Sequence, residues 1–172
     1  MRKGYIQIYT GNGKGKSTAA FGLALRALGA GFKVFIGQFA KKTPCSELKS
    51  LKKFAPNLVI KQYGRGCFIR GKPNEEDFVA AGKGFNELKK IISSGEYDIV
   101  ILDEITIVNR CKLIEVDDVL ELLKTKPEHV ELVLTGRYAD PRLIEAADLV
   151  TEMKEIKHYY SKNIKARKGI EK

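Results

Sequence analysis

The sequence predicts an α/β fold, in which helices cover both faces of a mostly parallel sheet. Strand-like runs alternate with helical patterns along the 172 residues. The run at 98–102 is apolar after its first residue, as in a strand buried on both faces. A glycine-rich turn joins the first run to a helix of small residues. Alternation of this kind is typical of parallel strands connected through helices.

The first half of the chain predicts three strands and two helices. Residues of high β propensity mark the strands, and glycines 29 and 31 end the first helix as glycines commonly do. Pro56 limits the second helix, which is basic. In order, the elements are strand 5–9, helix 17–28, strand 33–39, helix 47–54 and a strand that begins at residue 58.

The second half continues the alternation without a break in composition, so we expect one domain over residues 1–172. Pro73 and Asn74 open a long amphipathic helix that reaches about residue 92. A basic, polar tail follows the last strand. After the long helix, the predicted elements are strand 98–102, helix 115–124, strand 129–135, helix 141–147 and strand 149–153.

Composition excludes several classes of protein. With 44% hydrophobic residues the chain is not disordered, and it holds no apolar run long enough to span a membrane. The start Met1-Arg2-Lys3 leads into a strand-like run and not into a signal peptide. Three widely spaced cysteines at 45, 67 and 111 favour neither a disulfide framework nor a zinc cluster. We therefore expect a cytoplasmic protein.

Residues 10–18 read TGNGKGKST and lie between the first strand and the first helix. They match the second half of the P-loop pattern, and Thr10 stands where that pattern has its first glycine. Three glycines would curl the main chain into an anion nest at the start of the helix. Lys16 would supply a charge and Ser17 a magnesium ligand. Lys14 is either a phosphate ligand or a solvated loop residue.

Two further strand ends fit a P-loop nucleotide site. Asp103 and Glu104 follow the buried strand 98–102, where such folds complete the Mg²⁺ site. Arg137 follows strand 129–135, at the edge of a parallel sheet where ligands bind; a solvated loop arginine is the alternative. Arg26 in the first helix faces either a ligand or a structural partner. The chain is therefore expected to be P-loop NTPase-like (RecA-like).

The chain also resembles the P-loop type of ATP:corrinoid adenosyltransferase, the CobA/CobO type. The stretch from Tyr9 to Gly22 carries the strongest likeness, including the threonine before the glycine-rich loop. The likeness extends over nearly the whole chain, from about residue 5 to residue 171. Its other matches are Arg26-Ala27, Gly29, Gly31, Gln38-Phe39, Leu102-Asp103-Glu104, Thr135-Gly136-Arg137, Ala147-Asp148, Lys157-His158, Ala166 and Gly169-Ile170.

The resemblance implies transfer of the 5′-deoxyadenosyl group of ATP to the Co(I) of a corrinoid, with triphosphate leaving. Lys16 and Glu104 would be catalytic, and Mg²⁺ would bind Ser17, Asp103 and Glu104. Corrinoid contacts would come from Gln38, Phe39 and Phe68. The ATP-binding residues would be Gly11, Asn12, Gly13, Lys14, Gly15, Lys16, Ser17, Thr18 and Arg137.

The resemblance further implies a homodimer. Family members often carry Phe-Thr-Trp in the loop after the third strand, where this chain has Phe68-Ile69-Arg70 and no tryptophan at all. Some members have an N-terminal arm over the active site. Here the first strand starts at Tyr5, so we expect any lid to come from elsewhere. The chain ends in Lys172, where an aromatic residue is common.

Other functions fit part of the pattern. A P-loop ATPase or nucleoside kinase acting at the γ-phosphate would use the same loop and acids. A nucleic-acid-dependent ATPase would explain the net charge of +10 but lacks a recognisable binding motif. Nine basic residues and one acid lie between 41 and 72, so the charge is local. This basic region would dock an acidic, flavodoxin-like electron donor, or it would be a solvated helix face. We expect no nucleic-acid or membrane partner.

Overall fold

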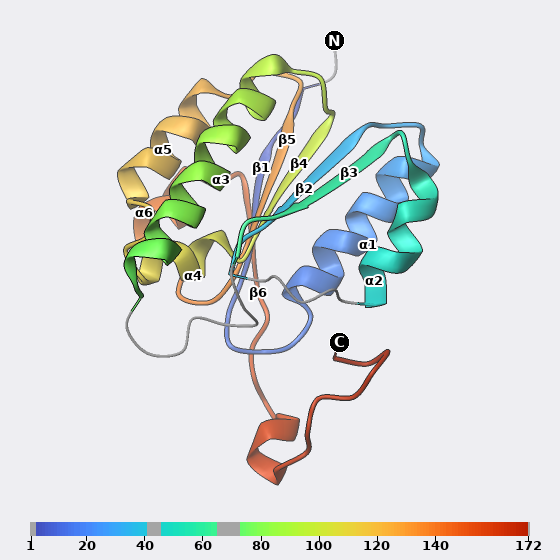
Figure 1. Ribbon diagram of the computed structural model, residues 1–172, viewed down its shortest axis with the longest axis vertical. Coiled ribbons are helices and arrows are strands. Elements are labelled where there is room, and N and C mark those ends of the chain that lie inside the picture. Colours follow the sequence, from blue (N-terminus) through green and yellow to red (C-terminus); the bar gives the residue numbers. More distant parts are fainter. Residues whose placement is uncertain (1–2, 41–45, 65–72, 172) are drawn as a thin grey trace.

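The computed structural model describes residues 3–40, 46–64 and 73–171. The strands of these residues form one sheet in the order β3-β2-β4-β5-β1-β6, and every neighbouring pair is parallel. This arrangement confirms the predicted α/β class (Figure 1). The strands are β1 Ile6–Thr10, β2 Val34–Gln38, β3 Leu58–Gln62, β4 Ile99–Asp103, β5 Glu131–Thr135 and β6 Leu149–Glu152.

Helices cover both faces of the sheet, as Figure 1 shows. On one face lie α1 (Lys16–Gly29) and α2 (Ser46–Leu51), with α2 continued by the 3-10 turn η1 (Lys52–Phe54). A second short 3-10 turn, η2 (Tyr159–Lys162), lies in the C-terminal tail. The helices of the other face are α3 Glu75–Ser94, α4 Ile105–Arg110, α5 Val116–Thr125 and α6 Pro141–Ala146.

Each face of the sheet has its own hydrophobic core. The core beneath α1 and α2 joins Ala20 and Ala24 to Ile36 and Ile101, and that beneath α3, α5 and α6 contains Leu88, Val119 and Leu143. Strands β2, β4 and β5 are buried at every position, which explains why their sequences are apolar throughout most of their length. The edge strand β6 is exposed at all four residues.

Capping residues account for where two of the helices begin or end. The side chain of Asn74 accepts a hydrogen bond from the Asp77 N–H, and the Asp77 carboxylate accepts one from the Asn74 N–H. This reciprocal cap starts α3 where the sequence predicted, and Gly95 ends it in the left-handed conformation with φ 64°. Asp140 caps α6, with Pro141 in its first turn.

Two segments differ from expectation. Helix α4 begins directly after Glu104 and was not predicted, because six residues are too few to show a helical period. The basic helix expected at 47–54 is divided into α2 and η1. Among the described residues, no helix is long and apolar enough to cross a bilayer.

The parallel arrangement places the carboxyl ends of all these strands at one edge of the sheet. The loop after β1, the ends of β2, β4 and β5, and the segment after β6 therefore meet there. Figure 1 shows the C-terminal tail leaving β6 at this same edge. Any ligand held by several strand ends must bind on this side of the molecule.

Candidate functional site

The glycine-rich loop between β1 and α1 packs against the segment that follows β6. The Gly13 N–H donates to the Met153 carbonyl at 2.6 Å, and the Met153 N–H donates to the Thr10 carbonyl at 2.8 Å. A Cβ added at Gly11 or Gly13 would lie 2.5 or 2.6 Å from the Met153 carbonyl oxygen. Glycine is required here because the two main chains approach so closely.

Lys16 is the first residue of α1 and turns back into the loop. Its Nζ donates to the Gly13 carbonyl at 2.6 Å, and the residue is only 7% exposed. Burial lowers the pKa of Lys16, while the carboxylate of Glu104 raises it. Arg137 lowers the same pKa, and Asp103 raises it. The predicted lysine, the two acids and the arginine are thus close enough to act on one another electrostatically.

Asp103 ends β4 and is completely buried. Its Oδ1 accepts from the Thr135 hydroxyl at 2.7 Å, and its Oδ2 accepts from the Gln38 amide at 3.1 Å. Glu104 follows with φ 63°, in the left-handed region, and forms the N-terminal cap position of α4. This turn separates the two acids, with Asp103 inside the sheet edge and Glu104 half-buried beside the loop.

Three side chains of the loop and of the turn at the end of β4 carry oxygen atoms of the kind that could hold a magnesium ion. Ser17 offers a hydroxyl at the start of α1, and Asp103 and Glu104 offer carboxylates. Over residues 3–40, 46–64 and 73–171, no three or more His, Cys, Asp or Glu side chains are grouped as a self-sufficient metal site. Mg²⁺ commonly takes one or two carboxylates and completes its shell with phosphate oxygens and water.

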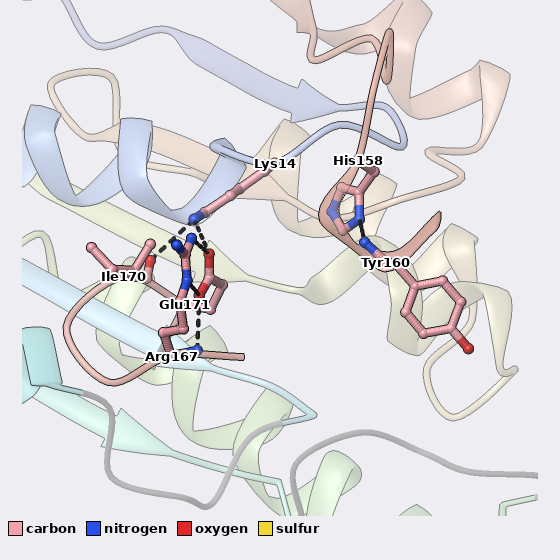
Figure 2. A network of polar contacts seen from close by, with 6 residues as sticks. All are labelled: Lys14, His158, Tyr160, Arg167, Ile170 and Glu171. Carbon is pink, nitrogen blue, oxygen red and sulfur yellow. Dashed lines mark hydrogen bonds and ion pairs between the residues drawn. The ribbon is translucent and has the colours of Figure 1, made fainter. Parts of the chain in front are cut away.

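Lys14 points toward the C-terminal tail, as Figure 2 shows. Its Nζ lies 2.9 Å from a Glu171 carboxylate oxygen and 3.1 Å from the Ile170 carbonyl oxygen. Arg167 also holds Glu171 through its main-chain N–H and its guanidinium, and these bonds lower the pKa of Glu171 to about 2. Both cations lie over the Tyr159 ring.

The other polar residues of the loop are more exposed than Lys16. Asn12 and Thr18 are exposed, and Ser17 is half-buried. Arg26 is exposed on α1, more than two turns beyond the loop, and its charge acts on the Tyr9 hydroxyl instead of on Lys16. His129 bonds the Gly95 carbonyl and His158 the Tyr160 N–H, so both histidines serve local packing.

The predicted corrinoid residues fall in two different environments. Phe39 is 1% exposed and packs against the Tyr63 ring with a centroid separation of 5.3 Å. Gln38 is 0% exposed, and its amide is used inside the sheet edge. Both side chains are buried, at and just after the carboxyl end of β2, and their assignment to the corrinoid stays a prediction. Phe68 lies outside the described residues.

Several features could not be anticipated from the sequence. Glu155 also acts on the pKa of Lys16, although it stands in the tail with no motif around it. The ion pair of Lys14 with Glu171 joins positions 157 residues apart. A cavity of about 570 Å³ lies between α2 and β3, lined by Leu48, Lys49, Leu51, Lys52, Ala55, Leu58, Ile60 and Gln62.

Comparison with known proteins gives a consistent result. Residues 2–171 match the family model described as ATP:corrinoid adenosyltransferase BtuR/CobO/CobP. A corrinoid adenosyltransferase of Pseudomonas aeruginosa is 35% identical over 170 residues, which cover 98% of this chain and 84% of that protein. Another, from Sinorhizobium sp, is 39% identical over 172 residues, covering 98% and 80% of the two chains.

A third corrinoid adenosyltransferase, from Escherichia coli K12, is 34% identical over 170 residues, covering 98% of this chain and 86% of that protein. Among solved structures, the flagellar accessory protein FlaH of Methanocaldococcus jannaschii superposes with a TM-score of 0.61 at 16% identity. That match covers 88% of this chain and 72% of FlaH, and it shows a shared fold.

Proposed function

The chain belongs to the ATP:corrinoid adenosyltransferase family, and from this membership we propose that the glycine-rich loop and the strand ends beside it form its active site. The enzyme transfers the adenosyl group of ATP to a corrinoid. The observation that carries the site proposal is the convergence of Lys16, Glu104, Asp103 and Arg137 at the carboxyl edge of the sheet.

The loop would bind the triphosphate of ATP. In this role Gly11 to Thr18 surround the phosphates, and Lys16 and Arg137 neutralise charge on the leaving triphosphate. The reduced corrinoid is the nucleophile, so the protein contributes orientation and leaving-group stabilisation. The bond from Lys16 to the Gly13 carbonyl holds the amine inside the loop that would surround the phosphates.

Magnesium would be held by Ser17 and Glu104, with Asp103 contributing directly or through water. When bound, the ion supplies positive charge to the phosphate oxygens. Asp103 accepts hydrogen bonds from Thr135 and Gln38, which hold its carboxylate in one orientation at the end of β4. Glu104 stands close enough to Lys16 to raise its pKa, which supports a shared phosphate site.

Product analysis tests the reaction directly. Under anaerobic conditions, ATP and a chemically reduced corrinoid should yield a light-sensitive Co–C product and triphosphate in equal amounts. A P-loop ATPase or kinase would release orthophosphate or form ADP instead. Formation of ADP or orthophosphate without an adenosylated corrinoid would contradict the proposal.

Corrinoid recognition is assigned to the loop that carries Phe68. Replacement of Phe68 by alanine should raise the KM for corrinoid more than the KM for ATP, because an aromatic ring would press against the corrin face. Gln38 and Phe39 are proposed corrinoid contacts as well, but both are buried, so loss of the Phe39 ring should also lower thermal stability. Equal effects of Phe68→Ala on both KM values would count against this assignment.

The basic face of α2 and η1 would dock an acidic, flavodoxin-like electron donor. Lys49, Lys52 and Lys53 are all exposed there. Reversing the three to glutamate should slow turnover driven by a reductase and donor protein, and should spare turnover with a chemical reductant. Equal slowing of both would contradict docking. We further propose that the chain forms one nucleotide-binding domain, acts as a homodimer and works in the cytoplasm.

A further inference from the structure

Side-chain hydrogen bonds link the last residues of four neighbouring strands. The Gln62 amide at the end of β3 donates to the Gln38 carbonyl oxygen at the end of β2, at 3.0 Å. Gln38 donates in turn to Asp103 at 3.1 Å, and Thr135 at the end of β5 donates to the other Asp103 oxygen at 2.7 Å. We call this series, Gln62–Gln38–Asp103–Thr135, the strand-end chain.

The strand-end chain continues into the main chain of Glu104. The Glu104 N–H donates to the Thr135 hydroxyl oxygen at 3.0 Å, so this one hydroxyl serves both acids. Glu104 has φ 63°, a conformation that is unfavourable for a residue with a side chain. The hydrogen bond from its N–H helps to hold this turn, which sets the direction in which the Glu104 carboxylate leaves the sheet.

Burial makes the arrangement rigid. Gln38, Asp103 and Thr135 are each 0% exposed, so water does not compete for these bonds. A buried network whose members are satisfied holds its groups in one arrangement, whereas deleting a member costs more than the same deletion at the surface. The register of the strands supports this network, because Gln38 is the direct partner of both Gln62 and Asp103 across the sheet.

We propose that Thr135, Gln38 and Gln62 are positioning residues for the adenosyl transfer. They hold the Asp103 carboxylate and the Glu104 turn in place, so that Glu104 faces the Lys16 region before ATP binds. Thr135 acts most strongly because it bonds both acids, Gln38 less because it bonds one, and Gln62 least because it acts through Gln38. The proposal rests on the proposed function, since it assigns these residues to the same site.

The test measures ATP affinity by calorimetry without corrinoid, with and without Mg²⁺. Thr135→Val should weaken Mg²⁺-dependent ATP binding by about tenfold to a hundredfold, as loss of an outer-shell partner commonly does. Thr135→Ser, which keeps the hydroxyl, should restore affinity to within about threefold. Gln38→Leu should have a smaller effect than Thr135→Val, and Gln62→Leu the smallest. With EDTA in place of Mg²⁺, the variants should differ much less.

Matched controls separate positioning from general stability. Thr125→Val removes a hydroxyl that bonds the Glu121 carbonyl at the end of α5, and Gln7→Leu removes a strand glutamine that bonds Glu131. Both should leave Mg²⁺-dependent ATP binding unchanged even if the thermal midpoint falls. If Thr135→Val does not fold, the ATP affinity of Gln38→Leu is compared with that of Thr135→Ser, which keeps the hydroxyl.

Two results would overturn the proposal. One is unchanged ATP affinity in folded Thr135→Val or Gln38→Leu; the other is a loss of the same size in the presence and absence of Mg²⁺. Failure of the enzymatic reaction itself is a separate outcome. Wild-type protein that binds Mg²⁺ and ATP but forms no adenosylated corrinoid would contradict the proposed function, while the calorimetric series would still decide the role of the strand-end chain.

Discussion

The two sides of the glycine-rich loop between β1 and α1 differ in how they hold their lysines. On the inner side, Lys16 is buried, bonds the Gly13 carbonyl and faces the acids at the end of β4. On the outer side, Lys14 keeps 43% of its side chain exposed and pairs with Glu171 of the tail. Two residues of separation in the sequence therefore lead to two different environments.

The difference follows from where each partner comes from. The groups that act on Lys16 on the inner side lie at the ends of central strands, and the whole sheet holds these strands in place. The outer partners belong to a tail whose residues 159–170 are exposed. Exposed ion pairs contribute little to stability because water and salt screen them, whereas buried charged groups depend strongly on their neighbours. We therefore expect changes on the inner side to affect activity most.

The largest effect should come from Lys16→Ala. Loss of the buried cation should reduce kcat/KM for ATP by about a hundredfold or more, because the proposed role of the Lys16 charge is to stabilise the leaving triphosphate. Thermal stability should hold, since burial of a charged amine is itself unfavourable. Steady-state kinetics and thermal denaturation check both expectations. Activity close to wild type would remove the basis for the inner side as the catalytic one.

Glu104→Gln should have the next largest effect and should also change the pH profile. Burial lowers the pKa of Lys16 and Glu104 raises it, so removing the Glu104 charge lowers this pKa further. Lys16 then loses its proton at a lower pH, and the alkaline limb of kcat/KM should move toward neutral pH.

The comparison variant for that shift is Glu155→Gln. Glu155 also raises the pKa of Lys16, but less than Glu104 does, so its removal should move the alkaline limb by a smaller amount. Kinetics measured from pH 7 to pH 10.5 resolve the order. An alkaline limb that does not move in Glu104→Gln would contradict the electrostatic link between these two groups.

A smaller effect is expected for Lys14→Ala on the outer side. The amine already binds the Glu171 carboxylate and the Ile170 carbonyl, so triphosphate must displace them to gain this charge. The KM for ATP should rise by no more than about threefold, as expected for an exposed charge, and less at high salt. A loss as large as that of Lys16→Ala would show that the two sides do not differ in function.

The smallest effect should come from Glu171→Gln, which frees Lys14 without touching the loop. ATP affinity should change by at most about twofold, because the pair is exposed. Arg167 loses its charged partner, so the tail should be cleaved faster by trypsin at residues 162–168, and Glu145→Gln on α6 serves as the exposed control. Unchanged cleavage would indicate that Glu171 does not hold the tail.

Much of the fold could be predicted from the sequence because the patterns that indicate its strands and helices lie within short, continuous stretches. Apolar runs marked β2, β4 and β5, and Pro73 and Asn74 marked the start of α3. The glycine-rich loop and the acids after β4 also stand in continuous stretches. Helix α4 was missed because its six residues carry no readable period.

The sequence by itself therefore determined the order of the strands and of the helices other than α4, the glycine-rich loop and the family resemblance, since each depends on neighbouring residues. Tertiary structure alone decided that Gln38 bonds Asp103, that Phe39 packs in the core and that Lys14 meets Glu171. These contacts join residues 24 to 157 positions apart. Such pairings depend on strand order and register, which local patterns do not encode.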